Sequence, residues 1–178
     1  GVELLRVDDP QGKKNIPLSS RCRKANDWGA EVCISFHHDA AGKIFAGGGV
    51  TAHWAKAADQ KYAAAIYNTV IEAGGIRGNR SNPIPKDNLY VPKHCKAPTV
   101  LLECGFMDST VDSKIILDPA YSKLVGYATM EAIARVKGLK KKAADKPAAS
   151  DQMYRVRLSW ADAASQKGAF RVLDYAID

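Results

Sequence analysis

Five short stretches rich in apolar and β-branched residues predict strands along the chain. They are VELLRV (2–7), EVCISFH (31–37), AGGGVTAHW (46–54), NLYVP (88–92) and APTVLLECGF (97–106). The second and the fifth are apolar without alternation, which is typical of strands that are covered on both faces of a sheet. We therefore expect these two to be central strands.

Three longer stretches, 17–29, 56–75 and 118–138, space their apolar residues three to four positions apart, which predicts amphipathic helices. Asp118 and Pro119 open the third stretch as a typical helix start. The second has the clearest pattern, with one apolar stripe and two terminating glycines: Ala58, Tyr62, Ala65, Ile66, Val70, Gly74 and Gly75.

Helices that alternate with short buried strands predict an α/β fold. We expect a three-layer αβα arrangement, in which helices cover both faces of a mainly parallel, twisted sheet, over residues 1–139. Residues 140–151 are rich in Lys, Ala and Pro and predict a linker. Residues 152–178 predict the start of a small α+β unit that is cut short.

The 178-residue chain has a formal net charge of +7, which predicts attraction to polyanions such as nucleic acid, anionic lipid or an anionic cell-wall polymer. Part of this charge is local, because KGLKKKAADK (137–146) carries five lysines. A nucleic-acid role would rest on net charge alone, so we expect no nucleic-acid partner.

The four cysteines, Cys22, Cys33, Cys95 and Cys104, form neither a CxxC motif nor a zinc-finger spacing. Cys33 and Cys104 lie in apolar runs, where a free cysteine packs as a small hydrophobic residue, so we expect buried thiols there. No apolar stretch approaches the length of a membrane span, and no signal peptide is visible.

Polar residues stand where two of the predicted strands end: His37, His38 and Asp39 at one, Glu103 in the other. In open α/β sheets such strand ends meet at one edge, which would bring an imidazole and a carboxylate together, as in zinc hydrolases. A structural alternative is a salt-bridged Glu103 and a hydrogen-bonded His37. We expect His38 to face away from His37 and to form a pocket wall.

Other polar features predict less chemistry. His53 and His94 are expected at the surface. His94 and Cys95 are adjacent on a segment predicted to be extended, where side chains point apart, so we do not expect a Cys/His nucleophile pair. The glycines at 47–49 lack the context of a phosphate loop and are expected to let the backbone approach a ligand or another strand.

Two segments, RCRKANDWGAEVCISFHHDAAG and NLYVPKHCKAPTVLLECGFMDS, resemble the zinc-dependent N-acetylmuramoyl-L-alanine amidases of the amidase-3 type. In that family an R…AN segment precedes a strand ending in S-x-H-x-[ND]-A, and the catalytic glutamate lies in V-L-x-E-x-G-F. Both motifs occur here in the same order, and the resemblance covers residues 1–139.

The resemblance implies that His37 is a zinc ligand, that Glu103 is the catalytic glutamate and that Asp39 supports the site. Asn88 and Tyr90, in the NLYVP segment, would line the substrate groove. The implied reaction is hydrolysis of the amide bond between N-acetylmuramic acid and L-alanine in peptidoglycan. In that reaction Zn²⁺ polarises the carbonyl and activates water.

The chain departs from the family pattern in one respect. The family has two further zinc ligands, a histidine and a glutamate, which lie upstream of the segment where this chain begins. We therefore expect an N-terminally truncated amidase that is inactive as an isolated piece. The stretch from Tyr154, with its Gly168-Ala169-Phe170, resembles the start of a SPOR-like, cell-wall-targeting module.

Two other functions stay open: a non-catalytic cell-wall-binding protein held by its charge, and another metal-dependent peptidase or amidohydrolase on a similar fold. We expect action at the bacterial cell wall, either as a secreted autolysin or as a phage endolysin released at lysis. The sequence does not define the stem-peptide type or the oligomeric state.

Overall fold

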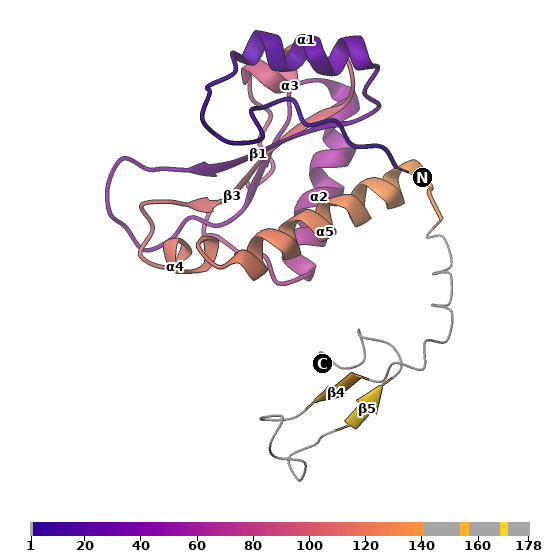
Figure 1. Cartoon of the computed structure of the whole chain (residues 1–178). Coiled ribbons are helices and arrows are strands. Elements are labelled where there is room, and N and C mark those ends of the chain that lie inside the picture. Colours follow the sequence, from indigo (N-terminus) through magenta and orange to yellow (C-terminus); the bar gives the residue numbers. More distant parts are fainter. Residues whose placement is uncertain (1, 141–153, 157–167, 171–178) are drawn as a thin grey trace. The chain divides into compact units, whose positions relative to one another are not determined.

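A computed structural model describes residues 2–140, 154–156 and 168–170 (Figure 1). The chain divides into two compact units, Gly1–Leu139 and Lys140–Asp178. In the second unit, strands β4 (Tyr154–Val156) and β5 (Gly168–Phe170) pair antiparallel. Apart from Lys140, the expected linker at 140–151 lies outside the described residues, as does most of the unit expected at 152–178.

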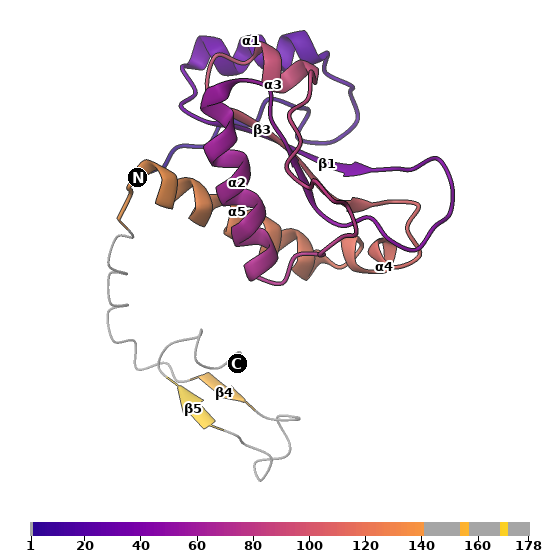
Figure 2. The ribbon, with the colours of Figure 1, turned by 180° about the vertical axis from the view of Figure 1, so that it is seen from behind.

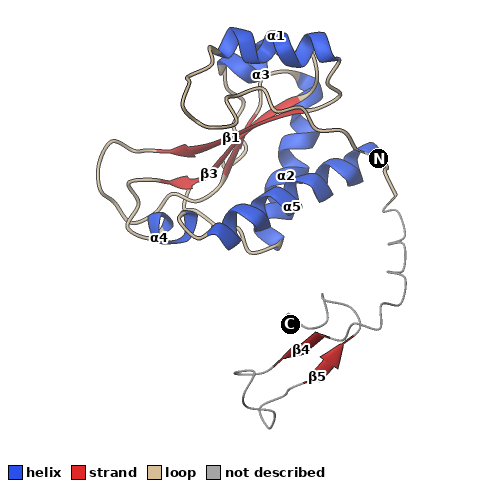
Figure 3. Cartoon of the chain, in the orientation of Figure 1, coloured by secondary structure: helices blue, strands red, loops and turns tan. Residues whose placement is uncertain are grey.

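The first unit has a mixed α/β fold around a small sheet of three strands (Figure 3). The strands are β1 (Cys33–Asp39), β2 (Thr51–His53) and β3 (Thr99–Phe106), in the order β1-β3-β2. Strand β3 pairs parallel with β1 and antiparallel with β2. The expected mainly parallel sheet is therefore not confirmed for the described residues, and the three-layer αβα arrangement stays a prediction.

Strand β3 is central and buried along its whole length except at Glu103, as expected. The same expectation was wrong for β1, which is an edge strand in the described sheet and leaves Phe36 52% exposed. The run 31–37 contains enough apolar residues for a covered strand, but no described strand pairs with its outer edge.

The strand expected at 2–7 is also absent from the described structure. A cavity of about 950 Å³ is lined by this segment, by β1 and by residues of three helices. The extended segment therefore has no neighbouring strand whose N–H and C=O groups could complete a ladder, and hydrogen-bonded pairing is what defines a strand.

The helices follow the predicted apolar periodicity in the three long stretches (Figures 1 and 2). Two shorter α-helices and one 3₁₀ helix complete the set. In chain order the described helices are α1 (Leu18–Trp28), η1 (Ala57–Asp59), α2 (Gln60–Glu72), α3 (Tyr90–His94), α4 (Asp112–Ile116) and α5 (Pro119–Lys137). In both views α1 and α3 lie together, away from the packed pair α2 and α5.

The main core forms where α2 and α5 pack against the sheet. The predicted stripe on α2 is confirmed at Tyr62, Ile66 and Val70, which are all buried. Ala58 was expected in that stripe but is exposed, because it lies in the 3₁₀ turn before the α-helix begins. On α5 the Asp118 carboxylate accepts a hydrogen bond from the Ala120 N–H at 2.8 Å, which confirms the predicted helix start.

The strand expected at 88–92 is instead the start of helix α3. The Lys93 N–H donates to the Leu89 carbonyl at 3.1 Å, and the Cys95 N–H donates to the Val91 carbonyl at 3.1 Å. Pro92 is tolerated because it falls in the first turn, where its missing N–H is not needed. Four apolar or aromatic residues in a short run did not distinguish a strand from one helical turn.

The triple glycine at 47–49 approaches another segment of backbone, as expected. A Cβ atom on Gly78 would lie 1.6 Å from the Gly48 carbonyl oxygen, and one on Gly49 would lie 2.2 Å from the Gly78 nitrogen. Only residues without side chains allow this contact, which leads the chain from the β1–β2 connection into β2.

Candidate active site

The sheet register places His37, Glu103 and Thr51 side by side across the three strands. His37 on β1 is paired with Glu103 on β3, and Thr51 on β2 is paired with the same glutamate. Residues in register share a face of the sheet, so the imidazole and the carboxylate lie on one side. A register shift between His37 and Asp39 pairs Asp39 with Phe106, a local irregularity of the kind common beside active sites.

Glu103 is a carboxylate without a hydrogen-bond partner in an apolar strand. Its Oε2 atom is buried and has no partner among the described residues. Burial, and secondarily the charge of Asp39, raises the Glu103 pKa to about 7, while Arg80 acts in the opposite direction. A carboxyl with this pKa exchanges its proton near neutral pH, which is the property of a general acid–base.

His37 lies next to Glu103 as a half-buried imidazole. Its Nε2 atom is 3.0 Å from the Ser35 hydroxyl, which lies on the same face of β1. Burial lowers the His37 pKa, and the positive charges of Arg21 and His38 add to that effect. The ring is therefore neutral at pH 7, which is the form that binds metal ions.

Asp39 is held at the rim of the site. Its carboxylate forms an ion pair with the Arg80 guanidinium at 3.0 Å, and its carbonyl accepts a hydrogen bond from the Met107 N–H at 2.8 Å. Arg80 in turn lies 4.8 Å from the centroid of the Phe106 ring. These contacts place one negative and one positive charge close enough to Glu103 to shift its pKa in opposite directions.

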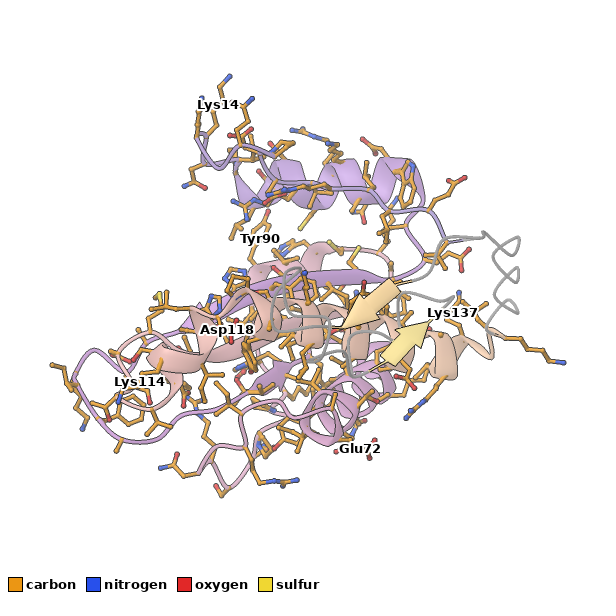
Figure 4. All side chains as sticks on the ribbon, turned by 60° about the horizontal axis from the view of Figure 1, so that its bottom comes forward. Lys14, Glu72, Tyr90, Lys114, Asp118 and Lys137 are labelled. Carbon is orange, nitrogen blue, oxygen red and sulfur yellow. The ribbon has the colours of Figure 1, made fainter. Side chains whose placement is uncertain are left out.

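The other expected site residues are exposed. His38 is exposed while His37 is half-buried, consistent with the expected alternation along β1. Asn88 and Tyr90 are exposed, and Tyr90 stacks on His94 with ring centroids 3.9 Å apart. Figure 4 shows Tyr90 on the side of the unit that carries α1, away from Glu72 at the end of α2. The described hydrogen bonds join neither Asn88 nor Tyr90 to the site.

The interpretation of His53 as a surface residue was wrong. His53 is only 9% exposed, its Nδ1 atom contacts the Asp87 carboxylate, and its Nε2 atom is 2.9 Å from the Thr51 hydroxyl. In the tautomer that carries its proton on Nδ1, this atom donates to the carboxylate and Nε2 accepts the hydroxyl proton. The spacing of Thr51 and His53, two residues apart on one strand, could have indicated that their side chains meet on one face. The contact with Asp87 could not be predicted, because Asp87 is distant from His53 in the sequence.

The family model for N-acetylmuramoyl-L-alanine amidases, Amidase_3, matches residues 1–135. The chain belongs to the Amidase_3 family. Among curated Amidase_3 relatives, the N-acetylmuramoyl-L-alanine amidase CwlM of Bacillus licheniformis is 26% identical over 149 residues, covering 80% of this chain and 53% of CwlM. The probable cell wall amidase LytH of Staphylococcus aureus is 26% identical over 132 residues, covering 74% of this chain and 41% of LytH.

Solved structures show the same fold. The catalytic domain of the amidase CwlV from Bacillus (Paenibacillus) polymyxa superposes with a TM-score of 0.64 at 20% identity, covering 71% of this chain and 69% of that one. Apo Ami1 from Mycobacterium abscessus also gives 0.64, at 17% identity, covering 72% and 65%. The chain spans about half the length of the curated relatives it matches. Residues 1–135 therefore match the Amidase_3 family model, and the described unit shares the fold of amidase catalytic domains.

The donors of this Amidase_3 domain do not complete a metal site by themselves. In the part of the chain that the structure describes, no group of three or more His, Cys, Asp or Glu side chains is placed to hold a metal ion. A catalytic zinc ion normally has three protein ligands. His37 is available as one neutral imidazole, and the buried Oε2 of Glu103 faces no partner, but these two side chains are not a full ligand set.

The described helices include none that is long and apolar enough to cross a membrane.

Proposed function

We propose that this Amidase_3 domain hydrolyses the amide bond between N-acetylmuramic acid and L-alanine in peptidoglycan. The observation that carries the proposal is Glu103: a half-buried carboxyl with one buried, partnerless oxygen and a pKa raised to about 7, beside the neutral ring of His37. The relatives CwlM, an N-acetylmuramoyl-L-alanine amidase, and LytH, a probable cell wall amidase, support the substrate class.

Glu103 would carry the proton in both halves of the reaction. Its carboxylate takes a proton from a water molecule while the water oxygen adds to the amide carbonyl carbon and forms a tetrahedral intermediate. The carboxyl then donates this proton to the alanine nitrogen as the carbon–nitrogen bond breaks. The products are a lactyl carboxylate and a free L-alanine amine. A pKa near 7 favours both transfers, since neither direction is strongly uphill at neutral pH.

We also propose that His37 is the ligand that this chain contributes to a zinc ion. The neutral imidazole supports this role. The remaining protein ligands would have to come from outside the described residues. Asn88 and Tyr90, on the exposed surface at α3, are proposed to contact the substrate.

The site of action is proposed to be the bacterial cell wall, reached as a secreted autolysin or as a phage endolysin. Residues 152–178 are proposed to belong to a SPOR-like wall-targeting module. The net charge of +7 supports attraction to an anionic wall polymer.

The test is cleavage of purified peptidoglycan by the intact protein in the presence of zinc, with released amino groups identified by end-group labelling. We expect Glu103→Gln to lower the rate about 10²- to 10⁴-fold, the usual contribution of a general acid–base. Glu72→Gln is the matched control, because Glu72 is exposed at the end of α2 and should leave the rate unchanged. His37→Ala should abolish the cleavage that depends on zinc, whereas His94→Ala, at an exposed position, should leave that cleavage unchanged.

Three results would contradict the proposal. Unchanged cleavage by Glu103→Gln would remove the proposed acid–base. New amino groups other than that of L-alanine would indicate a peptidase. Salt-sensitive binding to the wall without amine release would indicate a non-catalytic wall-binding protein.

A further inference from the structure

Three of the four cysteines gather in a small core that is separate from the candidate active site. Cys22 comes from α1, Cys33 begins β1, and Cys95 directly follows α3. Cys22 and Cys95 form a buried cluster with Ala25, and Cys33 packs against it. Cys104 belongs to the main core instead. All four are free thiols in this structure.

Cys95 is a buried member of this thiol cluster. Its side chain packs in one cluster with Cys22, and Cys33 packs against the same cluster, so the three thiols belong to neighbouring side chains. The backbone around it is fixed: the Lys56 ammonium donates to the carbonyls of Cys95 at 2.5 Å and Ala97 at 2.7 Å. The Cys33 N–H donates to the Pro98 carbonyl at 2.9 Å, which holds the start of β1 against the same segment.

The cluster can be reached from outside despite its burial. Cys33 and Cys95 both line the cavity of about 950 Å³ that runs along the outer edge of β1. Cys22 does not line this cavity. A small reagent that enters it therefore meets two of the three sulfurs.

We propose that Cys33 and Cys95 are a redox-active pair that forms a disulfide with a small-molecule disulfide, such as oxidised glutathione, as the oxidant. The Cys33 thiolate attacks one glutathione sulfur, which gives a mixed disulfide and releases one reduced glutathione. The Cys95 sulfur then attacks the Cys33 sulfur, loses its proton and expels the second reduced glutathione. Two protein thiols are oxidised, and one disulfide is reduced to two thiols.

The electrostatics of the cluster support this order of attack. Hydrogen bonds from Cys95 and Thr99 lower the Cys33 pKa to about 7, although burial acts against them. Burial raises the Cys22 pKa to about 11. Hydrogen bonding with Cys33, and secondarily burial, raises the pKa of the Cys95 thiol. Cys33 is therefore the thiolate near neutral pH, and the thiolate is the attacking species.

The disulfide would join the strand that carries His37 to the segment that follows the helix carrying Tyr90. Strand β1 is the open edge of the described sheet, so a covalent link at its first residue would hold the position of that edge. The pair is independent of the proposed reaction at Glu103, so its test does not require cleavage activity.

The test is to incubate the reduced full chain with oxidised glutathione, count thiols after denaturation, and map disulfide-linked peptides by mass spectrometry. We expect loss of two thiols per chain, one peptide pair that joins Cys33 to Cys95, and a rise in melting temperature of roughly 5 °C. Cys104→Ser is the matched control and should oxidise like the parent chain. Cys95→Ser should stop at a mixed disulfide on Cys33, and Cys33→Ser should react at least tenfold more slowly.

Three outcomes in the parent chain would overturn the proposal: four persistent thiols, an intermolecular disulfide only, or a Cys22–Cys95 bond in place of Cys33–Cys95. Oxidation of Cys33→Ser at the parent rate would equally show that Cys33 is not the nucleophile.

Discussion

Three carboxylates with buried oxygens lie around strand β3, and they differ in what satisfies those oxygens. Asp112 is 1% exposed, and its Oδ2 atom accepts hydrogen bonds from the N–H groups of Gly49 at 2.6 Å and Phe106 at 3.0 Å. Asp59 is fully buried and accepts from the Thr99 and Lys56 N–H groups. Glu103 lies on β3, between Thr99, which donates to Asp59, and Phe106, which donates to Asp112. It has a buried oxygen with no partner among the described residues.

The difference separates structural from functional acids. Asp59 and Asp112 sit where loops and helix starts leave backbone donors unpaired, and they satisfy those donors. Glu103 satisfies nothing, and burial disfavours its charged form. A polar group that costs stability without a structural return is typical of an active site. Substitutions in the two groups should therefore have stability effects of opposite sign.

The largest effect is expected for Asp112→Ala. The change leaves the Gly49 and Phe106 N–H groups buried without an acceptor, so we expect the free energy of unfolding to fall by about 3 kcal/mol or more. Urea denaturation measures it. Asp118→Ala is the control, since the Asp118 carboxylate accepts only the exposed Ala120 N–H at the helix start, and its loss should cost only about 1 kcal/mol. A loss below that of the control would contradict a structural role for Asp112.

Glu103→Gln should stabilise the fold at high pH. The Glu103 pKa is about 7 in the folded chain against 4.5 for an unperturbed glutamate. Its stabilising contribution as a protonated group is therefore fully present below pH 4.5 and is lost as pH rises through 7. The glutamine variant lacks this loss, so we expect it to be more stable than the parent at pH 8 by on the order of 1 kcal/mol or more.

The pH dependence is the decisive part of that comparison. The difference between Glu103→Gln and the parent should shrink between pH 8 and pH 5, as measured by urea denaturation at each pH. Glu72→Gln, at an exposed position, should show no such trend. A glutamine variant that is less stable than the parent at pH 8 would mean that the Glu103 carboxylate has a structural partner.

The sequence allowed much of this to be expected, and the failures share a physical cause. Glu103 could be identified because a charge inside an apolar run is costly wherever the strand lies. The α2 stripe at Tyr62, Ile66 and Val70 follows from local periodicity. The edge position of β1, the absence of a strand at 2–7 and the burial of His53 all depend on contacts between distant segments. Such contacts leave no periodic signal.

Asp39 and Arg80 offer a smaller test of the same account. Asp39 raises the Glu103 pKa and Arg80 lowers it. Asp39→Asn should therefore lower that pKa and Arg80→Gln should raise it, each by less than about one pH unit because both groups are partly exposed. Titration of the Glu103 side-chain carbon by NMR distinguishes the two signs. Shifts in the same direction for both variants would show that the two charges do not act on Glu103 as described.

The most direct measurement is the Glu103 pKa of the unsubstituted chain. A pH titration of ¹³C-labelled glutamate side chains, with the Glu103 signal assigned by its absence in Glu103→Gln, reports it without any need for substrate. We expect a midpoint of about 7. A midpoint near 4.5, the ordinary value for glutamate, would mean that the carboxylate is solvated or paired, and it would contradict the assignment of Glu103 as the general acid–base.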